Sequence, residues 1–165
     1  MKRILTILIS MLILASCSNQ NNSVENESKD FSLEDQMNEA IIGYFGHRVE
    51  IPEQAVKTIE FNEKNGNLKV VVTTLAFMDE TVEEFKADLL DSCILLLQEI
   101  QMQDKVQNLT LVVEIPYEKE NGENINYGVF KIDFTQEKLL KVNFDKLNPQ
   151  NLREKADFYF EAPFY

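Results

Sequence analysis

Residues 56–75 read VKTIEFNEKNGNLKVVVTTL, and this stretch decides the fold class of the chain. Residues 56–61 and 68–75 are rich in β-branched and aromatic side chains, which favour strands. Between them lies the cluster NEKNGN, in which Asn65-Gly66 tolerates the positive φ angles of a tight turn. The segment is therefore predicted to form a β-hairpin.

A helix is predicted on each side of this hairpin. Before it, Ser32 and Asp35 have the spacing of an N-terminal cap, and a helical stripe of apolar residues runs up to Gly46, a natural stop. After it, Asp79 or Thr81 can cap a longer amphipathic run, and Thr81 with Glu84 has the capping-box spacing. The two apolar stripes comprise Leu33, Met37, Ala40, Ile41, Tyr44 and Phe45 in the first helix, and Val82, Phe85, Leu89, Cys93, Leu96, Leu97 and Ile100 in the second.

A second pair of strands follows the longer helix. Apolar side chains alternate along both strands, which is typical of strands with one buried face. These side chains are Leu109, Leu111, Val113 and Ile115 in the first strand, and Phe130, Ile132 and Phe134 in the second. The segment between them contains Asn121-Gly122, so a second hairpin is predicted.

Two further helices are predicted near the C-terminus. A short one is expected around residues 137–141. Asn148 can cap a last helix that has Pro149 at its first position and extends over residues 149–160. The resulting order, αββαββαα, predicts an α+β two-layer domain: a four-stranded, mainly antiparallel sheet of two hairpins with helices on one face.

The composition limits the number of domains and the class of partner. Of the 165 residues, 44% are hydrophobic, which suffices for one domain with its own core, and we assign this domain to residues 31–165. Two cysteines cannot build a disulfide scaffold, so folding must depend on apolar burial. The net charge of -12 excludes nucleic acid as an ordinary partner, because an acidic surface cannot neutralise phosphates.

The first residues have the layout of a secretory signal peptide. Residues 1–3, MKR, are positively charged, and residues 4–14 are almost entirely apolar. As a helix, residues 4–16 would span about 20 Å, which is less than the roughly 30 Å hydrocarbon core of a membrane. The segment is therefore expected to direct export and not to remain as a membrane span.

The end of this segment, Leu14-Ala15-Ser16-Cys17, resembles the lipobox of bacterial lipoproteins: an aliphatic residue, two small residues and a cysteine. The resemblance implies that residues 1–16 are removed and that the Cys17 thiol carries a diacylglyceryl anchor. It also implies a place on the extracytoplasmic side of the cell membrane or the outer membrane, held there by the lipid. The alternative is an ordinary export signal that is cut after Ser16 and releases a soluble protein.

Residues 17–30 are interpreted as the lipidated N-terminus and a flexible tether. Residues 18–29 read SNQNNSVENESK and contain one apolar side chain, Val24, which is too little to offset the entropy of ordering. Cleavage before Cys17 would remove two of the 16 basic residues and none of the 28 acidic ones, leaving a net charge of -14. Such a domain is repelled by an anionic membrane surface.

Catalytic motifs are missing from the sequence. His47 is the sole histidine, and there is no nucleophile elbow, zinc-protease motif, P-loop or dinucleotide-binding motif. We therefore expect no enzyme, no metal and no cofactor, and keep a small envelope hydrolase that uses His47 with nearby carboxylates as an alternative. Cys93 is predicted to be a buried small hydrophobe. The oxygen-rich residues 118–124 are interpreted as a solvated turn and not as a calcium loop.

The C-terminus is unusually aromatic. Five of the sixteen aromatic residues fall in the last eight positions: Phe158, Tyr159, Phe160, Phe164 and Tyr165. The favoured interpretation is that they dock on the sheet and complete the core, and the alternative is an exposed patch that binds a partner.

Anchor, tether and acidity together predict a non-catalytic module that binds or shields another envelope protein, one with a basic face. A small-ligand-binding lipoprotein, with its pocket between sheet and helices, is a further alternative.

Overall fold

The computed structural model describes residues 31–77, 79–119 and 121–163. In it, two capped helices flank the first hairpin along the chain. Helix α2 (Leu33–Phe45) begins where the Ser32 hydroxyl accepts a hydrogen bond from the Asp35 backbone N–H at 3.1 Å. Helix α3 (Val82–Gln101) begins at the corresponding capping box of Thr81 and Glu84. Both helix starts predicted from the cap spacing are confirmed.

Both predicted hairpins are present. Strand β1 (Val56–Asn62) pairs antiparallel with β2 (Asn67–Thr73), and β3 (Asn108–Glu118) pairs antiparallel with β4 (Asn124–Thr135). The strands of the second hairpin are longer than those of the first. Both also extend beyond the alternating apolar residues from which they were predicted.

The two hairpins are joined by a parallel pair of strands, so the sheet is mixed and the prediction of a mainly antiparallel sheet of two hairpins is confirmed only in part. Strand β2 runs parallel to β3, from Asn67 opposite Asn108 to Thr73 opposite Glu114. The physical reason is the connecting helix: α3 has 20 residues and is about 30 Å long, so it carries the chain back along the whole length of β2. Strand β3 therefore starts at the same end of the sheet as β2.

The prediction of four strands and a last helix to Phe160 was wrong. Helix α5 (Pro149–Lys155) ends early, and β5 (Phe158–Glu161) adds a fifth strand antiparallel to β4. Without β5, the outer edge of β4 would present unpaired backbone groups, and an aromatic run such as 158–160 is well suited to a strand. The sheet order is β1-β2-β3-β4-β5, and a short helix, α4 (Gln136–Leu139), follows β4.

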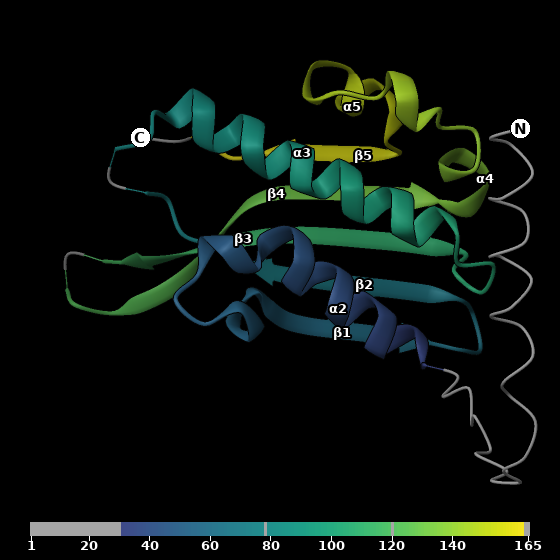
Figure 1. The fold of residues 1–165 in the computed structure, drawn as a ribbon, viewed down its shortest axis with the longest axis horizontal. Coiled ribbons are helices and arrows are strands. Elements are labelled where there is room, and N and C mark those ends of the chain that lie inside the picture. Colours follow the sequence, from purple (N-terminus) through teal and green to yellow (C-terminus); the bar gives the residue numbers. More distant parts are fainter. Residues whose placement is uncertain (1–30, 78, 120, 164–165) are drawn as a thin grey trace, which may run out of the picture. The chain divides into compact units, whose positions relative to one another are not determined.

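Helices α2 and α3 lie side by side across one face of the sheet, and α5 packs next to α3 (Figure 1). The layer between sheet and helices is filled by a cluster of buried apolar side chains. Its largest fully buried members are Phe45, Phe130, Phe134, Met37, Ile41, Leu68, Leu89, Leu96, Leu97, Ile100, Leu111 and Ile132. An α+β domain with a two-layer core is thus confirmed, and the small-ligand alternative gains no support from this packed layer.

Cys93 lies in this core on α3, fully buried as predicted, and burial raises the pKa of its thiol. In the part of the chain that the structure describes, no helix combines the length and the apolarity that crossing a membrane requires.

Gly66 closes the turn between β1 and β2 under a close approach from another loop. Its φ angle is +66°, and a Cβ placed there would lie 2.5 Å from Cγ of Gln107 and 2.7 Å from the carbonyl oxygen of Lys105. Gly122, in the turn of the second hairpin, has φ +79° with no other atom within 4 Å of such a Cβ. Both glycines therefore adopt a positive φ angle that disfavours other residues. Gly66 is in addition surrounded by atoms that leave no space for a side chain.

The pair gives a matched test of this packing. Gly122→Ala should lower the free energy of unfolding by about 1 kcal/mol, the cost of a left-handed alanine. Gly66→Ala should lower it by about 3 kcal/mol, because the loop that holds Gln107 must also move. Urea unfolding at neutral pH measures both values. Equal losses would show that the contact between the turn and this loop contributes nothing.

Candidate functional site

The aromatic residues predicted to bind a partner are divided between two sides of the sheet. Phe158 and Phe160 alternate with Tyr159 along β5, and their side chains lie on the face away from α2 and α3, 48% and 45% exposed. Lys131, the β4 residue opposite Phe160, places its ammonium 5.2 Å from the centre of the Phe158 ring. Phe164 and Tyr165 lie outside the described residues.

Tyr159 belongs to the core side. Its ring meets Phe130 at a centroid distance of 6.4 Å, and the guanidinium of Arg153 lies 5.2 Å from the Tyr159 ring. Its hydroxyl donates a hydrogen bond to Glu161 at 3.2 Å. Burial, reinforced by the Glu161 carboxylate, raises the pKa of Tyr159. The core interpretation thus describes Tyr159, whereas Phe158 and Phe160 remain available for contact with a partner.

A second exposed apolar surface lies on the long hairpin and was missed in the sequence. Ile115 pairs with Tyr127, and Tyr117 pairs with Ile125, all on one side of the ribbon. We call these four residues the hairpin strip. With Lys119, Val129 and Pro163 they line a hollow of about 470 Å³. The signal was present, because Ile125 and Tyr127 alternate with polar residues, but the turn was placed at residues 118–124 and the second strand was predicted from Phe130 onward.

A third feature is a buried cluster of charges around Arg48, whose side chain is only 3% exposed. Its guanidinium donates to both carboxylate oxygens of Glu80, at 3.0 and 2.7 Å, and also to Asp88. The rings of Phe77 and Phe85 lie 5.1 and 5.2 Å from the same guanidinium. The hydrogen bonds that Arg48 donates hold the pKa of Glu80 below its usual value, and the same hydrogen bonds to the Glu80 carboxylate raise the pKa of Arg48.

His47 lies at the edge of this cluster. Its Nε2 is 3.4 Å from Oδ2 of Asp88, and its side chain is 52% exposed. The same Asp88 oxygen accepts a hydrogen bond from Arg48, so this carboxylate is already engaged in a structural contact. The hydrolase alternative therefore gains an acid near His47, but the His47 side chain itself is half exposed. Within residues 31–77, 79–119 and 121–163, no group of three or more His, Cys, Asp and Glu side chains is placed to hold a metal ion.

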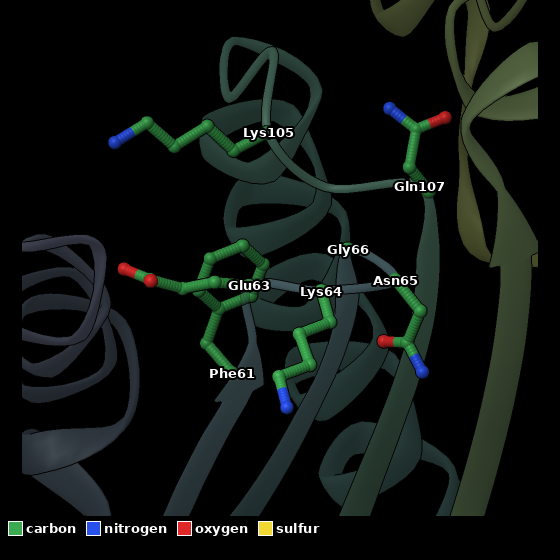
Figure 2. Close-up of a pocket in the computed structure, with 7 residues that line it drawn as sticks. All are labelled: Phe61, Glu63, Lys64, Asn65, Gly66, Lys105 and Gln107. Atoms are coloured by element: carbon green, nitrogen blue, oxygen red, sulfur yellow. The ribbon is translucent and has the colours of Figure 1, made fainter.

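A hollow of about 520 Å³ lies at the turn between β1 and β2, under the loop that follows α3. Its polar side chains include Glu63, Lys64 and Lys105 (Figure 2). The ammonium groups of Lys64 and Lys105 point in different directions and do not converge on one point (Figure 2). This hollow therefore offers no concentrated charge with which to hold a ligand.

The chain matches no family model, and no curated protein or solved structure is significantly similar to it. The surfaces described above are therefore the basis for any statement about function.

The Arg48 cluster generates a test with a definite pH dependence. Glu80→Gln should lower the free energy of unfolding by about 2 kcal/mol at pH 7, since charge-assisted hydrogen bonds to buried Arg48 are lost. The pKa of Glu80 is lowered by folding, so its stabilisation is complete above the ordinary Glu value of about 4.3 and is lost as the pH falls further. The difference between wild type and variant should shrink in that range.

Urea unfolding of both proteins between about pH 7 and pH 3.5 measures this difference. The matched control is Glu83→Gln, because Glu83 is an exposed acid in the first turn of α3. It should cost less than about 0.5 kcal/mol. A loss at Glu80 that is independent of pH would contradict the assigned ion pair.

Proposed function

We propose that this chain is a lipid-anchored bacterial lipoprotein whose domain, residues 31–165, binds or shields another protein of the cell envelope without catalysing a reaction. Its place would be the extracytoplasmic side of the cell membrane or the outer membrane. The anchor is supported by the lipobox-like Leu14-Ala15-Ser16-Cys17 and by the polar tether that follows it. Two or more acyl chains hold a protein on a bilayer almost permanently, because each buried methylene contributes about 0.8 kcal/mol.

The observation that carries the binding function is the exposure of Phe158 and Phe160 on the edge strand of the sheet. Both rings project from the same side of β5 and stand about 7 Å apart along the strand, the repeat of alternate residues. Large, rigid aromatic side chains supply much of the binding energy at protein interfaces. Among the described residues, β4 is the one strand that pairs with β5, so the other edge of β5 is open to hydrogen bonds with an added strand.

The charge of the chain indicates which kind of partner fits. The acidic residues outnumber the basic ones by 28 to 16. Near the two phenylalanines, Lys131 is already paired with Asp133 at 3.4 Å, so this lysine adds no net positive charge to the surface. A partner with a basic face is attracted and oriented by such a domain, and the attraction weakens as salt screens it.

The anchor is tested by metabolic labelling with an alkyne fatty acid in a bacterium that processes the full chain. Wild type should be labelled, pellet with membranes, and yield a mature N-terminus at Cys17. Cys17→Ser should lose the label, while Cys93→Ala, which removes the other cysteine, should keep it. A wild-type protein that carries no fatty acid, or whose N-terminus lies elsewhere, contradicts the anchor.

The partner surface is tested by placing a photo-crosslinking amino acid at Phe160 in the anchored protein and irradiating intact cells. We expect a discrete adduct with one envelope protein, and a yield that falls several-fold when the salt concentration rises to about 0.5 M, because charges attract the partner. The matched control position is Leu140, which is exposed to a similar degree but lies after α4. Identical adducts from both positions would argue against a specific surface on β5.

A further inference from the structure

The hairpin strip continues the core side of the sheet past the helices that cover it. Leu111 opposite Ile132, and Val113 opposite Phe130, are buried in the core cluster. Further along β3 the same side carries the strip, and there Tyr117 and Tyr127 are 52% and 40% exposed. Figure 1 shows this end of the hairpin projecting beyond α2 and α3. The strip is thus an apolar continuation of the sheet face that, in the rest of the domain, is covered by helices.

The bulge at the start of this projection adds a further apolar side chain. Val113 pairs with Phe130 and Glu114 with Gly128, so Val129 is the extra residue of β4. It joins Ile115 and the two tyrosines around the hollow. A volume of about 470 Å³ is within the range that accommodates one or two large side chains of a ligand.

The chemistry of the hollow favours an apolar insert over a charged one. Its walls are aliphatic and aromatic, and the one ammonium at its margin, that of Lys119, is paired with Glu123 at 2.9 Å. A charged head group would find no unpaired opposite charge among the residues that line the hollow. Apolar side chains would instead remove both tyrosine rings from water.

The charge around the strip selects among the candidate occupants. Residues 114–128 contain four glutamates and one lysine; Glu123 is paired with that lysine and Glu114 with Lys57 at 2.7 Å, so these four acids and two bases leave a net charge of -2. A second copy of the chain would bring the same acidic ribbon against itself, and an anionic lipid surface would be repelled as well. A protein segment that combines apolar side chains with lysine or arginine fills the hollow and also neutralises its margin.

We infer that the hairpin strip is a second binding site, which takes a short segment of a partner protein with alternating apolar and basic residues. The strip lies on the opposite side of the sheet from Phe158 and Phe160. The site is therefore separate from the surface used in the proposed function and does not depend on it.

The experiment uses the full anchored chain in phosphatidylcholine nanodiscs and a fluorescent synthetic peptide in which leucine and lysine alternate. Anisotropy should show binding that weakens by about tenfold or more in Y117S/Y127S, since exposed aromatic anchors dominate such contacts. Y117F/Y127F keeps the rings and should bind within about twofold of wild type, which separates lost contact from lost folding. Leu140→Ser should leave the affinity unchanged, and a peptide with glutamate in place of lysine should not bind.

Several outcomes would overturn the inference. One is equal affinity for wild type and Y117S/Y127S. Another is tyrosine quenching by brominated lipid that disappears in Y117S/Y127S while the peptide fails to bind, which would assign the strip to the membrane. A third is peptide binding that appears only after deletion of residues 164–165, which would assign the hollow to the chain's own end.

Discussion

The burial of α3 on the sheet constrains the rest of the domain. This helix places nine side chains in the interior and is long enough to return the chain along the whole of β2. Because it joins the two hairpins, they must lie side by side through a parallel pair at the centre of the sheet. The second hairpin has longer strands than the first, so its end extends beyond the helical layer. The hairpin strip is therefore exposed because β3 and β4 are longer than the part of the sheet that α2 and α3 cover.

Arg48 fixes the corner from which α3 departs. Its backbone oxygen accepts a hydrogen bond from the N–H of Leu75 at 3.0 Å, just after β2, while its side chain binds Glu80 before α3 and Asp88 within it. One residue thus connects the end of α2, the end of β2 and the start of α3. A buried cation has to be paired because an isolated one is costly to remove from water, and two carboxylates with two aromatic rings satisfy this one.

The two surfaces that we connect with binding have different origins. Phe158 and Phe160 are exposed because β5 is an edge strand whose alternate side chains face away from the helices. The hairpin strip is exposed because this end of the hairpin projects beyond α2 and α3, the helices that cover the rest of the sheet face in the described part of the chain (Figure 1). Both lie on a strongly acidic chain, which favours basic partners and opposes self-association. Together with the proposed lipid anchor, such surfaces would suit the proposed module that holds other proteins at the envelope.

The local features could be predicted from the amino-acid sequence alone: the helix starts at Ser32, Thr81 and Asn148, the two Asn-Gly turns and the α+β class. Caps and turns depend on contacts between residues two to four positions apart, so the residue types at these positions predict them. Four features became clear in the folded domain alone: β2 and β3 run parallel, residues 158–161 form a strand, Arg48 is buried and the hairpin strip is uncovered. Each of these features depends on which distant segment pairs with a strand edge, neutralises a charge or covers an apolar face. The spacing of residues along the sequence does not indicate which segment that is.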